Sequence, residues 1–151
     1  MSLAVLLFAA LPVAQGWAGA GRATAAPTVS VWAIRATHGG HEISKQLRPL
    51  AKALKKSFNF TGYRLVNKSA KPLGGGKATA FDLVKGYRAT ITPAGSEGGR
   101  IKLKIVVLQH KNKAYVKKLA TTVALRPGKY QLLGGWQLPG GDVLIIAVSA
   151  R

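Results

Sequence analysis

The chain has no cysteine and only four acidic residues among its 151. Without cysteine it can form no disulfide, no thiolate metal site and no cysteine nucleophile. Catalysis by a carboxylate pair requires two acidic side chains held about 5 to 10 Å apart, but these residues lie in distant segments: Glu42, Asp82, Glu97 and Asp142. No serine has a nucleophile-elbow pattern either. The absences predict a protein that is not an enzyme.

Motifs for cofactors and metals are also lacking. A Gly-rich segment before Lys77 lacks the Ser or Thr that the Walker pattern requires next. His38, His41 and Glu42 surround a Gly-Gly pair, and a glycine loop does not hold two imidazoles in a fixed geometry. We predict no cofactor and no metal. A zinc or copper ion would need a further ligand, from His110 or from water.

Basic residues are abundant by contrast. The 23 Lys and Arg residues give a formal net charge of +19 at pH 7. A surplus of this size creates a positive potential that attracts polymers or surfaces rich in phosphate or carboxylate groups. It indicates the sign of the partner's charge but not the partner's identity.

The first 25 residues have the features of a secretory signal peptide. Residues 3–20 are almost all apolar or small, and Ala23-Thr24-Ala25 fits the small-x-small pattern of a signal peptidase site. The uninterrupted apolar core spans only residues 3–11, whereas a membrane-spanning helix needs ~20 residues; a retained anchor is the alternative. We expect residues 1–25 to be a signal peptide and residues 26–151 a single β-rich domain, exported to the periplasm or the extracellular space.

The domain consists mainly of short runs rich in β-branched and aromatic residues, separated by turns that include residues 93–99 and 109–114. Because the connections are too short for crossover helices, the strands are expected to pair mostly antiparallel. The run 143–149 has no polar alternation, which predicts a central strand covered on both faces. The predicted strands are residues 29–37, 61–68, 78–84, 87–92, 101–108, 116–125, 130–136 and 142–149.

One segment has a helical period instead. Its leucines recur at helical spacing, which predicts a helix over residues 44–57, with Ser44 as its N-cap and with Pro49 able to shift its start later. The predicted fold class is therefore α+β: a mostly antiparallel β-sheet or small β-sandwich of seven or eight strands, with one amphipathic helix after the first strand. The helix either packs on the sheet or covers the open end of the sandwich.

The basic residues of this helix gather on one side of it. On a helical wheel they fall within a sector of about 100°, opposite the leucines. They are Lys45, Arg48, Lys52, Lys55 and Lys56. An ordinary solvated face mixes charges of both signs, whereas no acidic residue lies between residues 44 and 82. We predict a polyanion-binding face; the alternative is an ordinary solvated face that happens to be cationic.

A second basic group surrounds the connection between two predicted strands. We predict that it also binds polyanions, and it consists of Lys111, Lys113, Lys117 and Lys118. Lys102 and Lys104 point from the exposed face of the preceding strand, where lysines either bind a ligand or protect a sheet edge against association. Tyr115 is the best candidate for stacking on a nucleic-acid base, although no RNA-binding motif accompanies it.

Two parts of the chain carry a resemblance. The C-terminal segments 121–129, 133–135 and 144–148, and the helical leucines followed by Phe60 and Tyr63, are similar to segments of small exported proteins of Gram-negative bacteria without assigned function. The resemblance covers most of the mature chain. It implies an envelope location and assigns no catalytic residue.

Three functions are compatible with these features. The first is an exported module that binds anionic envelope polymers or lipid head groups through the basic helix face. The second is a structural or assembly subunit of a bacterial envelope machine, of secretion or pilus type, that docks an envelope-protein partner through a sheet edge. The third is a nonspecific nucleic-acid binder, since any domain this basic attracts nucleic acid.

Overall fold

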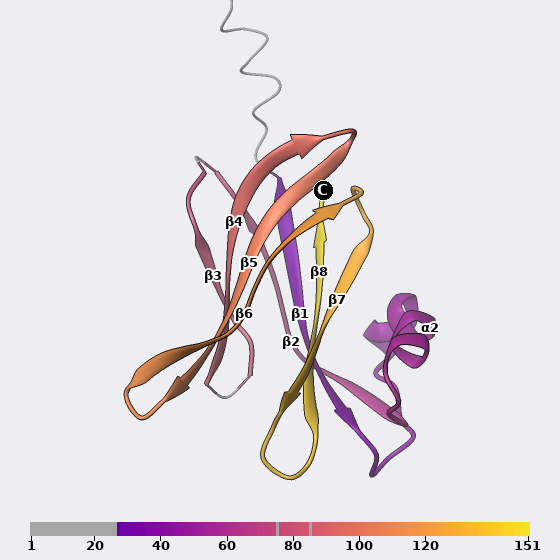
Figure 1. The fold of residues 1–151 in the computed structure, drawn as a ribbon. Helices are drawn as coiled ribbons and strands as arrows, with labels where there is room; N and C mark the ends of the chain where they lie inside the picture. Colours follow the sequence, from indigo (N-terminus) through magenta and orange to yellow (C-terminus); the bar gives the residue numbers. More distant parts are fainter. Residues whose placement is uncertain (1–26, 75, 85) are drawn as a thin grey trace, which may run out of the picture.

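The computed structural model describes residues 27–151, except 75 and 85, as a sandwich of two four-stranded antiparallel sheets with a short helix after the first strand (Figure 1). The predicted fold class is confirmed. The predicted signal peptide, residues 1–25, lies outside the described residues. Of the helices that the structure describes, none has the length and apolar character needed to span a membrane.

The first two and the last two of the eight strands form one sheet, and the middle four form the other. The first sheet has the order β2-β1-β8-β7 and the second has the order β3-β4-β5-β6. The strands are β1 (Thr28–Thr37), β2 (Gly62–Pro72), β3 (Thr79–Asp82), β4 (Tyr87–Glu97), β5 (Arg100–Lys111), β6 (Ala114–Leu125), β7 (Tyr130–Gln137) and β8 (Val143–Ala150). The helical segment consists of a 3-10 turn, η1 (Lys45–Leu47), and an α-helix, α2 (Arg48–Ser57).

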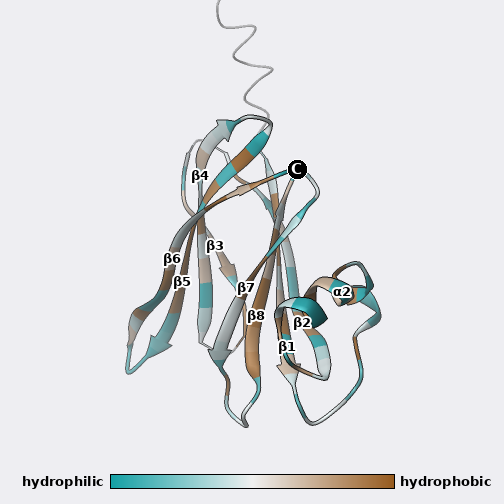
Figure 2. Cartoon of the chain, turned by 45° about the vertical axis from the view of Figure 1, so that its right-hand side comes forward, coloured by the Kyte–Doolittle hydropathy of each residue, from teal (hydrophilic) through white to brown (hydrophobic). Residues whose placement is uncertain are grey.

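Strand β8 is buried along its whole length, as its unbroken apolar sequence predicts. Much of it is brown, the colour of apolar residues, in Figure 2. On one face Leu144, Ile146 and Val148 belong to the core between the two sheets. On the other face Ile145 and Ala147 belong to a second apolar cluster, on the outside of the first sheet. This sheet therefore needs a cover on both faces.

Helix α2 supplies the outer cover. Leu47, Leu50 and Leu54 are buried against the second cluster, so the helix packs on the outer face of the first sheet and not over the open end of the sandwich. The hydroxyl of Tyr63 donates to the carbonyl oxygen of Phe58 (3.0 Å), close to that of Leu54 (3.2 Å), which fixes the helix C-terminus to β2. Burial raises the pKa of Tyr63, so this donor keeps its proton.

The start of the helix differs from the prediction. The α-helix proper begins at Arg48, with Pro49 in its first turn, where proline is tolerated. Ser44 does precede the 3-10 turn, but its side chain caps nothing. Instead, its Oγ accepts a hydrogen bond from the backbone N–H of Leu65 (3.0 Å), so this serine attaches the loop to β2.

Two predicted turns are found at the expected places but are shorter than predicted, because the strands around them are longer. Strand β4 continues through Pro93 to Glu97, and only Gly98 and Gly99, both with positive φ, form the turn to β5. The β5–β6 hairpin likewise turns on two residues of positive φ, Asn112 and Lys113. Two-residue turns of this kind match the twist of the flanking strands, so pairing extends to the ends of the hairpin.

The two ends of the described chain lie side by side. β1 pairs with β8 over most of its length. Beyond the ladder, Thr28 and Arg151 exchange two backbone hydrogen bonds of 3.0 Å each. The first and last strands of the domain are thus neighbours at the centre of the first sheet.

Candidate functional site

The basic helix face is exposed as predicted. All five of its members are solvent-exposed, whereas the leucines on the opposite side of the helix are buried. Two of the five, Lys55 and Lys56, lie in the last turn, where the helix dipole favours positive charge. Arg48 lies in the first turn, where the dipole opposes it.

None of these five cations is neutralised by a carboxylate within the described residues. The ion pairs found there join Asp142 to Arg35 (2.5 Å), Asp82 to Arg88 (3.1 Å), and Glu97 to Lys102. Three of the four acidic residues are therefore paired with other cations: one pair involves the end of β1, and the other two lie on the second sheet. Five like charges on three helical turns repel one another without compensation.

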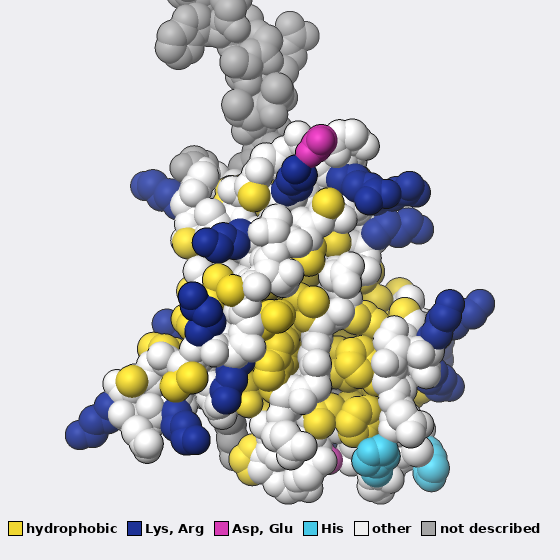
Figure 3. All heavy atoms as spheres, in the orientation of Figure 1, with side chains coloured by type: hydrophobic (Ala, Val, Ile, Leu, Met, Phe, Trp, Pro, Cys, Tyr) yellow, Lys and Arg dark blue, Asp and Glu magenta, His cyan; other side chains and the backbone are white. Residues whose placement is uncertain are grey.

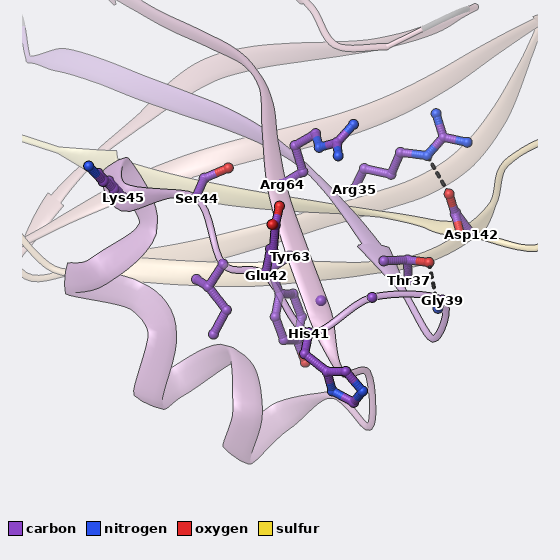
Figure 4. A pocket seen from close by; sticks show the side chains of 13 residues that line it. Arg35, Thr37, Gly39, His41, Glu42, Ser44, Lys45, Tyr63, Arg64 and Asp142 are labelled. Carbon is purple, nitrogen blue, oxygen red and sulfur yellow. Dashed lines mark hydrogen bonds and ion pairs between the residues drawn. The ribbon is translucent and has the colours of Figure 1, made fainter.

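A cleft of about 1110 Å³ adjoins the start of the helix (Figure 4). It is formed by the end of β1, the start of β2, Asp142 before β8, and the loop 39–45. Lys45 lines this cleft and also belongs to the basic helix face. The two surfaces are therefore continuous.

Two arginines lie directly opposite each other at the cleft. Arg35 of β1 is the register partner of Arg64 of β2. Strand alternation places Arg35 on the same face as Val31 and Ala33, which belong to the core between the sheets. Both guanidinium groups are drawn side by side in Figure 4. Like charges directly opposite on neighbouring strands destabilise a sheet, so this pair needs compensation.

Compensation is supplied to one arginine only. Arg35 Nε donates to Asp142 Oδ2 (2.5 Å) and Arg35 Nη2 donates to the carbonyl oxygen of Pro139 (3.3 Å). The hydrogen bond from Arg35 lowers the pKa of Asp142, with smaller contributions from Thr37 and from the charge of Arg64. Arg64 itself is exposed and has no ion-pair partner among the described residues. An anion in the cleft would meet a guanidinium that is free to bind it.

The second basic group lies elsewhere. Its four lysines are exposed around the tip of the β5–β6 hairpin, at the lower left of Figure 3, whereas the helix projects its basic side chains at the right. The fold does not bring the two groups together. Tyr115, near this tip, is flanked by the ring of His110 (5.0 Å between centroids) and by the guanidinium of Arg88 (5.3 Å). These two side chains already contact the ring that was predicted to stack on a nucleic-acid base.

The edge-protection prediction fails for Lys102 and Lys104. Both lie on β5, which pairs with β4 on one side and β6 on the other and therefore has no free edge. Lys102 instead pairs with Glu97 across the β4–β5 hairpin. Lys117 and Lys118, by contrast, lie on the edge strand β6, at a point where its register with β5 shifts by one residue. A bulge with two lysines is a common device against edge-to-edge pairing.

The histidines do not converge. The ring of His38 stacks on Phe60 with 4.5 Å between centroids, and His41 is exposed at the rim of the cleft. Over residues 27–151 without 75 and 85, no three His, Asp or Glu side chains are grouped closely enough to hold a metal ion.

The cleft arginines were missed at the level of sequence. One signal was available, because Arg35 is the only charged residue in the strand sequence VSVWAIRAT.

Comparison with family models, characterised proteins and solved structures finds no match to this chain.

Proposed function

We propose that the protein is an exported, non-enzymatic module that binds anionic envelope polymers or lipid head groups through the basic helix face. The observation that carries this proposal is the absence of compensation on that face. Five exposed cations have no carboxylate partner in the described part of the chain, although acidic residues are used for ion pairs elsewhere. An anionic surface or polymer would relieve their repulsion.

The adjoining cleft supports the same proposal. Arg64 has no ion-pair partner in the part of the chain that the structure describes, and Arg35 is held in place by Asp142. Lys45 lines the same cleft and belongs to the helix face. One phosphate or carboxylate group of a polymer can sit against Arg64 while the groups that follow it meet the helix. Guanidinium groups bind both kinds of anion through paired hydrogen bonds.

The test is a variant in which all five basic residues of the helix are changed to Gln. Each lysine or arginine near an anionic membrane contributes up to about 1 kcal/mol, so binding at low salt should weaken by several kcal/mol. Binding is measured by sedimentation with vesicles containing anionic lipid and by titration with an acidic polysaccharide. These two arms distinguish a lipid surface from a polymer as the ligand.

A matched control comes from the second basic group. Changing Lys111, Lys113, Lys117 and Lys118 to Gln removes nearly as much charge from a distant hairpin. If binding depends on the helix face, this control should retain most of its affinity. Equal losses in both variants would mean that only net charge matters, and an unchanged affinity of the helix variant would refute the proposal.

A further inference from the structure

Three of the four sheet edges are protected against pairing with another chain. β2 exposes Lys68 and Lys71, and Lys71 Nζ bridges to the carbonyl oxygen of Ala80 on β3 (2.7 Å). β3 itself has only four residues. β7 is interrupted at Gly134–Gly135, where its register with β8 shifts. Charge, shortness and bulges are the usual means of blocking edge pairing.

No strand of residues 27–151, without 75 and 85, pairs with the fourth edge, which is open over residues 119–125 of β6. This stretch follows the bulge at Lys117–Lys118 and pairs without interruption with residues 101–107 of β5. It contains no charged residue and no proline. In a chain with a net charge of +19, it is an edge segment on which a second copy would meet no like charge. A regular, uncharged edge of this kind is a template for strand addition.

The sequence of this edge is nearly symmetric about Thr122. It reads Leu-Ala-Thr-Thr-Val-Ala-Leu. If two copies pair antiparallel around a two-fold axis through Thr122, leucine lies opposite leucine, alanine opposite alanine, and threonine opposite valine of nearly the same size. A two-fold interface requires a surface that is complementary to itself, and this segment meets that requirement residue by residue.

The direction of the side chains agrees with the same register. Leu119 and Val123 pack against the core between the sheets, whereas Ala120, Thr122 and Ala124 are exposed. Pairing centred on Thr122 places inward side chains of one copy beside inward side chains of the other. A register shifted by one residue would pair residues that face the core with residues that face solvent, which disrupts the pleat of the sheet.

We propose that residues 119–125 of β6 dock a second copy of this chain, joined antiparallel about Thr122 to extend the second sheet across the dimer. Just outside the segment, Lys118 lies opposite Arg126 of the second copy. These like charges oppose association at low salt, so the dimer becomes tighter as salt screens them. Binding of polyanions to the helix has the opposite dependence on salt, so failure of either proposal can be recognised separately.

The experiment uses the absence of native cysteine. A Thr122→Cys variant carries a single thiol in each chain. In the dimer, the thiols of the two chains lie next to each other at the two-fold axis. Opposite residues of an antiparallel pair have Cβ atoms about 4.5 to 5.5 Å apart, close enough for a disulfide after small adjustments. Oxidation in high salt should convert most of the protein to a covalent dimer.

Ala120→Cys is the matched control, because it is equally exposed on the same strand but is two residues from the axis. Its two thiols would be separated by four residue steps, on the order of 13 Å, too far for a disulfide. Cross-linking of both variants to the same extent, or of neither, overturns the proposal. So does preferential cross-linking of Ala120→Cys.

A second measurement requires no cross-link. The unmodified protein should double its molar mass in light scattering as salt and concentration rise. Thr122→Lys, which places two charges together on the axis, should remain monomeric with an unchanged circular dichroism spectrum. A parent protein that stays monomeric at all salt concentrations, or a Thr122→Lys variant that still dimerises, refutes the inference.

Discussion

Helix α2 is held on the sandwich by a few leucines, and removing one of them should have a large effect. Leu54 is completely buried between the helix and the outer face of the first sheet. Truncation of a buried leucine to alanine removes apolar burial and leaves a cavity, which together lower the free energy of unfolding by about 2 to 5 kcal/mol. We expect Leu54→Ala to fall in this range.

The two separate apolar clusters determine what is lost. The residues around Leu54 belong to the outer cluster and not to the core between the sheets. The variant should therefore loosen the attachment of the helix and of the basic face that it carries, so binding to anionic vesicles weakens although no charge has been removed. Urea unfolding followed by circular dichroism gives the stability, and vesicle sedimentation gives the binding.

Ser57→Ala is the control, since it changes an exposed, uncharged position of the same helix. Surface substitutions of this kind alter stability by no more than about 0.5 kcal/mol. A loss below about 1 kcal/mol for Leu54→Ala would contradict a docked helix, because a fully buried leucine cannot be truncated at so little cost.

Two further predictions concern acid stability and processing. The hydrogen bond from Arg35 lowers the pKa of Asp142, so its ionised form stabilises the fold above the unfolded pKa of about 3.9, and this contribution disappears as the pH falls through the lower pKa of the folded state. Asp142→Asn should thus be less stable than the parent in urea unfolding at pH 7, with a gap that closes in acid; an equal gap at every pH would contradict the ion pair. Protein from the cell envelope should begin at Ala26 by intact-mass measurement, and retention of residues 3–20 would show that the segment is an anchor.

The strands and the helix could be predicted because each depends on local pattern. Apolar runs and helical spacing are visible in the sequence, and each predicted strand has a counterpart in the structure. The continuous burial of β8 also follows from its sequence alone. What the pattern did not show is which strands lie at the edges, because edge position depends on sheet order. This is why the edge-protection alternative for Lys102 and Lys104 was wrong.

The cleft could not be predicted for a related reason. Arg35 and Arg64 meet only because of the register between β1 and β2, and that register shifts between Ala33 and Ile34. The shift leaves Val66 of β2 without a partner on β1 and exposes its side chain. An extra residue of this kind reverses the expected facing of every residue beyond it, and nothing in the local sequence marks its position.

The pairing of β1 with β8 determines when the domain can finish folding. These strands are the first and last of the chain, yet they form the centre of one sheet and share both apolar clusters. The outer helix has no surface to pack on until β8 is in place. Closing a loop that spans nearly the whole chain is entropically unfavourable and slow. A chain synthesised from its N-terminus therefore cannot complete the first sheet until β8 has been made.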